Sequence, residues 1–148
     1  MAFDSAAIAR AVMDANSFVT LATADADGRP WASPVWFATE DYRHLYWVSA
    51  PDTRHSRNLA VRPELAMVVY DSTATPLEGQ AVYMTGTAAQ VTDGIEIFSR
   101  VSVRKGLREW GLDRVTGDAR LRLYRATVTE HHILDPDASI DVRAEVSW

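Results

Sequence analysis

Short apolar runs separated by brief polar turns recur along this chain, most clearly between Gly28 and Asp71. Aromatic and β-branched residues dominate residues 31–38 and 44–49, and such residues are typical of β-strands. The segment at residues 25–28 is typical of a hairpin turn, in which Gly28 supplies a positive φ. Consecutive strands joined by such short turns pair antiparallel, so the pattern favours an antiparallel β-barrel over a doubly wound α/β sheet.

Further strands and helices are expected on both sides of this stretch. The six strands are predicted at residues 17–23, 31–38, 44–49, 65–71, 80–92 and 120–134. One helix is capped by Asp4 or Ser5, a second covers residues 52–61 and stops before Pro63, and a third starts near Asp93. We therefore expect a single domain over residues 1–148, mainly β with peripheral helices, forming a six-stranded antiparallel barrel.

Three local patterns give finer predictions. Residues 65–71 are nearly all apolar, as in a strand that is covered on both faces. Gly86 stands in the middle of a predicted strand, which indicates a bulge or the close approach of another group. Asp93 with Glu96 three residues later resembles a capping box at the start of a helix.

Composition excludes several classes of function. The net charge of −5 and a pI near 5.3 argue against broad nucleic-acid binding, which usually needs a basic surface. The chain has no cysteine, which excludes disulfides, thiolate catalysis and cysteine-ligated metals. No run approaches the roughly 20 apolar residues of a membrane span, and residues 1–16 do not resemble a secretory signal. We expect a cytoplasmic protein.

A polar, basic segment at residues 52–59 is the first candidate site. It places Thr53, Arg54 and His55 where a strand gives way to a helix. Free N–H groups and the dipole of a helix N-terminus attract anions, and a guanidinium adds bidentate hydrogen bonds. The pattern therefore indicates a phosphate site, although the same residues also fit the solvated face of a short helix.

Other catalytic patterns find no support in the sequence. No Ser-His-Asp set, paired carboxylates or Gly-rich phosphate loop is evident. His131 and His132 suggest a metal site, but neighbours on a strand face opposite sides and do not readily bind one ion. A redox cofactor would account for this lack of catalytic side chains, because the cofactor itself performs the chemistry.

Three short motifs are specific when taken together, in their order and at their spacing: Gly28-Arg29-Pro30, Arg57-Asn58-Leu59 and Gly86-Thr87-Ala88. With the strands and turns between them, they closely resemble the FMN-binding split barrel of the pyridoxamine 5′-phosphate oxidase-like superfamily. The resemblance covers about residues 17–93 well and is looser beyond residue 120.

The resemblance implies roles for eight residues. Pro34, Val35 and Trp36 would lie beside the flavin ring, and Ser49 matches a hydroxyl residue that ends the next strand. The phosphate-binding stretch would be Thr53, Arg54 and His55, where His55 replaces the usual lysine and so weakens the fixed positive charge. Gln80 lies one position from a glutamine that many relatives place near the flavin.

The resemblance also implies a function and a partner. Such proteins are normally homodimers with flavin at the subunit interface, so we expect a non-covalent FMN protein that exchanges two electrons with a reduced nicotinamide or a small organic substrate. Two alternatives stay open: an F420-dependent reductase of the same fold, and a non-catalytic module that binds flavin or haem. Arg143 and Trp148 either reach the partner's cofactor pocket or belong to a packed or disordered tail.

Overall fold

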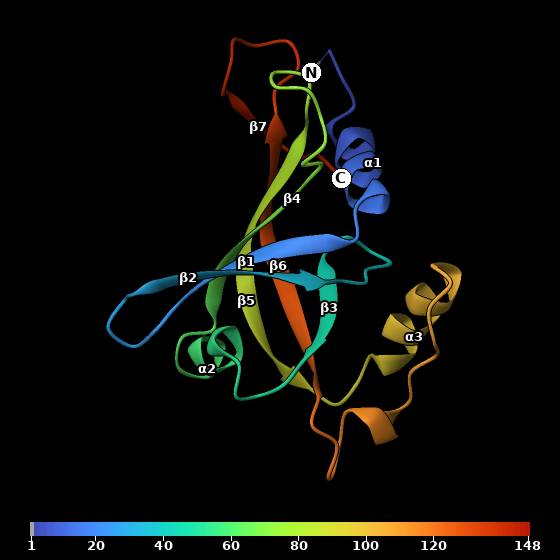
Figure 1. The fold of residues 1–148 in the computed structure, drawn as a ribbon. Coiled ribbons are helices and arrows are strands. Elements are labelled where there is room, and N and C mark those ends of the chain that lie inside the picture. Colours follow the sequence, from blue (N-terminus) through green and yellow to red (C-terminus); the bar gives the residue numbers. More distant parts are fainter. Residues whose placement is uncertain (1) are drawn as a thin grey trace.

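The computed structural model describes residues 2–148 as three α-helices, one 3-10 turn and seven strands of one antiparallel sheet (Figure 1). The helices are α1 (Ser5–Ala15), α2 (Arg54–Val61) and α3 (Ile95–Arg104), and the 3-10 turn is Leu112–Arg114. The strands are β1 (Phe18–Ala24), β2 (Pro30–Trp36), β3 (His44–Ser49), β4 (Glu64–Tyr70), β5 (Ala81–Val91), β6 (Arg122–Leu134) and β7 (Arg143–Glu145).

The sheet curls so that its two outer strands come back towards each other. Its order is β2-β1-β4-β5-β6-β3, and β7 pairs with β6 beside this path. Within residues 2–148, one isolated bridge joins the β2 side to β3, through paired backbone hydrogen bonds of 2.9 and 2.8 Å between Ala38 and Tyr46. The barrel is therefore split along the remainder of these two edges, which confirms the predicted fold class.

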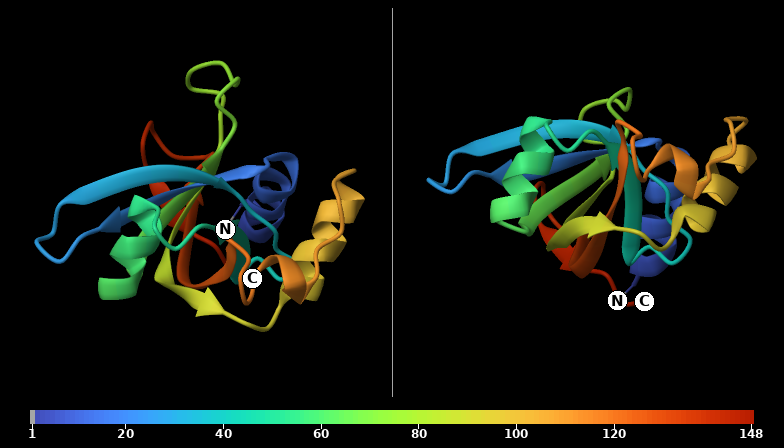
Figure 2. Two further views of the ribbon diagram at one scale, coloured as in Figure 1. Left: turned by 60° about the horizontal axis from the view of Figure 1, so that its bottom comes forward. Right: turned by 90° about the horizontal axis from the view of Figure 1, so that it is seen from below.

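One strand was not predicted. β7 has three residues, too few to show a hydrophobic period, and it forms by pairing with the end of β6 at Ile133 and Leu134. The Asp135 N–H donates to Val142 O at 2.8 Å and closes the loop between the two strands. The C-terminal segment contacts the start of α1, where the Ser147 N–H donates to Ser5 Oγ at 2.9 Å. Figure 2 shows α2 (green) and α3 (gold) on opposite sides of the sheet.

Two apolar clusters hold the fold together. The larger one fills the barrel, where α1 contributes Ala6, Ala9 and Met13 and the strands contribute residues such as Trp47. The smaller one lies between α3 and the outside of the barrel, where Phe98 and Ile95 pack near Tyr46. α1 belongs to the first cluster and α3 to the second. The two helices therefore stabilise the barrel from different sides (Figure 1).

The expectation that β4 is covered on both faces is wrong within this chain. Leu65, Met67 and Val69 are buried in the barrel, whereas Ala66 and Tyr70 on the other face are exposed. The inner residues pack against the barrel core, but no element of residues 2–148 covers the outer ones. An apolar run alone does not reveal whether the second cover comes from the same chain.

The start of α1 agrees with the sequence prediction, whereas the starts of α2 and α3 differ from it. Asp4 caps α1 by accepting a hydrogen bond from the Ala7 N–H at 3.0 Å, and Thr53 caps α2, which begins at Arg54 rather than residue 52. The capping box predicted at Asp93 does not form. Its carboxylate instead binds Arg125 at 2.9 Å. α3 begins at Ile95, and its N-cap residue Gly94 has no side chain to cap it.

The bulge predicted at Gly86 is present. The register between β5 and β6 shifts between Thr85 and Gly86. A Cβ at Gly86 would lie 2.1 Å from the backbone oxygen of Thr127, which is far closer than atoms can approach. Only glycine therefore lets the two longest strands pass each other at this point.

Gly86→Ala should destabilise the protein by about 2 kcal/mol, because the added methyl group must push β5 and β6 apart. Chemical denaturation of the two proteins measures this difference. Thr87→Ala, an exposed neighbour on the same strand, serves as the control and should change stability little. Equal stability of Gly86→Ala and the parent protein would contradict this account of the bulge.

Candidate functional site

The N-terminus of α2 lies between the two free edges of the split barrel. On one side it contacts the end of β3, where Ser49 Oγ is 2.8 Å from His55 Nε2. On the other side it contacts the start of β2, where the Arg54 guanidinium carbon lies 4.3 Å from the ring centre of Trp31. The sequence-predicted residues Ser49, Thr53, Arg54 and His55 are thus brought together at the split.

His55 is buried and forms part of a compact polar cluster. Its Nε2 lies within hydrogen-bond distance of Ser49 Oγ and, at 3.3 Å, of Thr53 Oγ1. Burial lowers the pKa of His55 below its ordinary value of 6.5, so the ring is neutral at pH 7. His55 therefore contributes hydrogen bonding to this site and no fixed positive charge.

The positive charge of the site comes from arginines. Arg54 and Arg57 are exposed, and neither side chain forms a hydrogen bond or an ion pair within residues 2–148. Arg54 is held over Trp31 by a cation–π contact that leaves its N–H groups free to bind an anion. Two cations beside a helix N-terminus form a suitable electrostatic environment for a phosphate.

Backbone N–H groups at the start of α2 are further donors for an anion. The Ser56 N–H donates to Thr53 Oγ1 at 3.4 Å, and the Arg57 N–H donates to Thr53 O at 2.9 Å. The amides of Arg54 and His55 belong to the first turn, which has no intrahelical acceptor for them. They form no hydrogen bond within residues 2–148, so they are available to an anionic ligand.

Asn58 fixes α2 in this position, a role that the sequence did not reveal. Its Nδ2 donates to Thr23 Oγ1 on β1 at 3.1 Å, and both residues are buried. Leu59 beside it enters the barrel core. The motif Arg57-Asn58-Leu59 was a signal that the segment matters, but only the position of Thr23 shows what Asn58 does.

Asn58→Ala should cost about 1–3 kcal/mol of stability, because it leaves the buried Thr23 hydroxyl without its donor. Thermal or urea unfolding measures the loss. Arg57→Ala removes the preceding exposed side chain and should unfold like the parent protein. If the two variants are equally stable, the hydrogen bond to Thr23 does not hold α2 in place.

The three residues predicted to line a flavin ring do not share one face. Pro34 pairs with Thr20 on the exposed outer face, whereas Val35 is buried in the barrel core. Trp36 packs edge-to-face on Phe98 of α3 with ring centres 5.2 Å apart. β2 is nevertheless an edge strand, so alternate backbone groups along it face the split and are free to meet a planar ligand.

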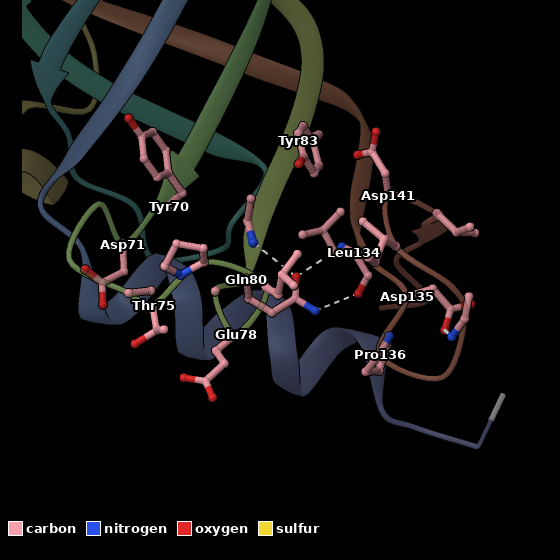
Figure 3. Close-up of a pocket in the computed structure, with 18 of the residues that line it drawn as sticks. Tyr70, Asp71, Thr75, Glu78, Gln80, Tyr83, Leu134, Asp135, Pro136 and Asp141 are labelled. Carbon is pink, nitrogen blue, oxygen red and sulfur yellow. Dashed lines mark hydrogen bonds between the residues drawn. The ribbon is translucent and has the colours of Figure 1, made fainter.

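Gln80 lies away from the other predicted residues within this chain. Figure 3 shows it at the base of a hollow between the β4–β5 and β6–β7 loops. Its Nε2 donates to Leu134 O at 2.6 Å, and its Oε1 accepts from the Leu134 N–H at 3.0 Å. These bonds hold the start of β5 to the end of β6, and the hollow beside them has a volume of about 690 Å³.

A second, apolar hollow was not predicted. It lies on the bare outer face of the sheet, close to Pro34, and has a volume of about 290 Å³. Its lining residues come from four strands: Thr20, Ala22, Ala66, Met67, Val68, Tyr83, Met84, Thr85 and His132. The sequence signal for this hollow was the continuous apolar run of β4, which we interpreted as a strand covered on both faces.

His131 and His132 face opposite sides of β6, as predicted. His131 is buried against the tail of the chain, whereas His132 lines the outer hollow. No group of three or more His, Cys, Asp or Glu residues in the described part of the chain is arranged to hold a metal. None of its helices is both long and apolar enough to cross a membrane.

Comparison with known proteins gives a family and several structural relatives. The family model described as pyridoxamine 5′-phosphate oxidase matches residues 7–135. The chain is similar in structure to HutZ, a haem storage protein from Vibrio cholerae, with a TM-score of 0.63 and 23% identity over 81% of this chain and 87% of that one.

Two further structures are similar to this chain. ChuZ from Campylobacter jejuni has a TM-score of 0.73 and 15% identity, and the match covers 93% of this chain and 57% of that one. An F420 reductase has a TM-score of 0.62 and 21% identity over 83% of this chain and 94% of that one. No curated protein matches the chain by sequence. At these identities the structural likeness shows the fold alone.

Proposed function

Because the chain belongs to the pyridoxamine 5′-phosphate oxidase family, we propose that it binds FMN as a homodimer. In this proposal it transfers two electrons, as hydride, between a reduced nicotinamide or small organic substrate and the flavin. The observation that carries the proposal is the position of the α2 N-terminus in the split of the barrel, with Arg54 and Arg57 unpaired beside it.

The phosphate of FMN suits the donors of this site. Arg54 would bind it through its free guanidinium N–H groups, and the amides of Arg54 and His55 would donate to its oxygens. Ser49 and Thr53 would hold His55 as a neutral hydrogen-bonding group beside it. The arrangement thus needs no charged residue at position 55.

The flavin ring would extend from the phosphate along the edge of β2. There the backbone of Pro34, Val35 and Trp36 borders the split, although the Val35 side chain points into the barrel and those of Pro34 and Trp36 lie on its outer side. FMN, when bound, supplies the redox chemistry, and the protein supplies binding and orientation. Gln80 would reach the same ring only from a second copy of the chain, because it lies apart from α2 in its own chain.

The burial of His55 favours FMN over F420. The resemblance described above implies that several F420-using relatives carry extra arginine or lysine at the positions of Thr53 and His55. Here those positions hold a hydroxyl and a neutral imidazole, so the extra positive charge is missing. Haem remains a third outcome to be tested, since HutZ is a haem storage protein and His132 borders the apolar hollow.

Arg54→Ala should weaken FMN binding about tenfold, because one charge-assisted hydrogen bond contributes about 1.5 kcal/mol. Quenching of flavin fluorescence during titration measures the dissociation constant. Arg108→Ala removes an equally exposed arginine outside the site and should bind FMN like the parent protein.

The same titration, run in parallel with F420 and haem, tests the cofactor itself. Failure of the parent protein to take up FMN would overturn the proposal, and tighter binding of F420 or haem would replace the cofactor. Anaerobic mixing of the FMN complex with NADH or NADPH then tests the reaction, since flavin that no donor bleaches would indicate a binding module.

The bare outer face of the sheet supports the homodimer. Val68 and Tyr83 line an apolar hollow there, with the Arg143 guanidinium over the Tyr83 ring, and Tyr70 on the same strand as Val68 is about half exposed. Contiguous apolar surface of this kind usually marks an interface. A second copy of the chain on this face would give β4 the second covered side that its apolar sequence predicted.

Val68→Asp should convert the protein from a dimer to a monomer, because it places a charge in the centre of this face. Light scattering after gel filtration gives the mass. Leu107→Asp makes the same kind of change at an exposed leucine after α3 and should leave the dimer intact. A dimer in both variants would place the interface elsewhere, and a monomeric parent protein would exclude it.

A further inference from the structure

The last residues of the chain are held against the barrel by a small set of contacts. The Val146 N–H donates to His131 O at 2.9 Å, and the Ser147 N–H donates to Ser5 Oγ at 2.9 Å. The Trp148 indole stacks on the Tyr42 ring with centres 5.7 Å apart and planes at 15°. The tail is therefore packed in this chain, one of the two arrangements that the sequence left open.

His131 links this tail to the body of the protein through both of its ring nitrogens. Nε2 lies 2.6 Å from Tyr42 O, and a carbonyl only accepts, so Nε2 carries a proton. Nδ1 lies 3.2 Å from Trp148 Nε1, and an indole N–H only donates, so Nδ1 is the unprotonated acceptor. Both partners have a fixed polarity, and only the neutral imidazole satisfies both.

Several charged groups lie around His131 and the Trp148 ring. Arg43, Glu130 and Glu145 line a polar hollow of about 250 Å³ together with His131 and Trp148. On the side of α1, the Arg10 guanidinium lies 5.6 Å from the Trp148 ring centre, and the Asp14 carboxylate accepts from the Tyr42 hydroxyl at 2.9 Å.

Burial is the main cause that lowers the pKa of His131 below its ordinary value of 6.5. Electrostatic repulsion from Arg43, with a smaller effect of the neighbouring His132, lowers this pKa further, whereas the hydrogen bond to Tyr42 opposes the effect. The packed tail thus favours the neutral ring. The contribution of neutral His131 to the stability of the packed tail is complete above pH 6.5, and it is lost as the pH falls below that value.

We propose that protonation of His131 releases residues 146–148 from the barrel. The added proton binds Nδ1, where it faces the indole N–H of Trp148, so a hydrogen bond becomes a contact between two donors. The carboxylates of Glu130 and Glu145 line the same hollow and offset part of the new charge, but among residues 2–148 neither accepts a hydrogen bond from the Trp148 indole. Release uncovers the Tyr42 ring and opens the polar hollow beside α1.

The experiment follows the Trp148 indole N–H by ¹H–¹⁵N NMR between pH 8 and pH 5, in the parent protein and in His131→Gln. In the parent protein, the Trp148 signal should move to the position of a solvated tail, with a midpoint below 6.5. In His131→Gln, which cannot titrate, this transition should be absent. His132→Gln removes the neighbouring imidazole and should retain the transition.

Trp47 provides an internal reference, because its indole is fully buried in the barrel core. If its signal changes together with that of Trp148, acid unfolds the whole chain and the proposal fails. A Trp148 signal that stays constant, or one that still titrates in His131→Gln, would also overturn it.

Trp148→Phe gives a second readout, since it keeps an aromatic ring but removes the N–H donor. The pKa of His131, measured from its own ring protons, should then rise by about half to one unit, because the neutral form loses a hydrogen bond. An unchanged pKa would show that Trp148 does not depend on the protonation state of His131.

Discussion

The pairing of β5 with β6 is the constraint on which the remaining structure depends. These are the longest strands, and their register shifts at Gly86, where a backbone oxygen of Thr127 leaves no room for a side chain. The bulge increases the bend and twist of the ladder. The sheet can then curl until β3, at one end of the strand order, returns to β2 at the other.

The split between β2 and β3 explains why the polar residues gather where they do. A closed barrel would pair these edges, whereas here α2 enters between them and is fixed by Asn58 on Thr23. Its first turn keeps its amides free, and Arg54 rests on Trp31 rather than on a carboxylate. Positive charge therefore stays available at the split, in a chain whose net charge is −5.

Two other surfaces differ from this site in what covers them. The outer face of β4 and β5 is apolar and bare, which is unfavourable in water unless another surface covers it. The tail at Trp148 packs on Tyr42 and His131 while it stays partly exposed, and in our proposal this packing depends on a neutral His131. We therefore propose that a second copy of the chain covers the first surface, and that protonation of His131 releases the second.

Sequence reasoning found six of the strands and the Gly86 bulge, because periodicity and glycine requirements act over a few residues. The family and its split barrel came from the resemblance of three short motifs to known proteins. Sequence reasoning also identified the segment of Thr53, Arg54 and His55 as a candidate phosphate site. It could not find β7, the role of Asn58, or the exposed side of β4, since each depends on a partner distant in the chain.

The sequence by itself determined the fold class and the polar character of the helix start, because local patterning and residue chemistry suffice for both. Only the tertiary structure decided that His55 is neutral, that Val35 is buried in the barrel while Trp36 packs on α3, and that Gln80 lies apart from α2. Burial, strand pairing and contacts between residues distant in the sequence set these properties. Neighbouring residues in the sequence therefore do not reveal them.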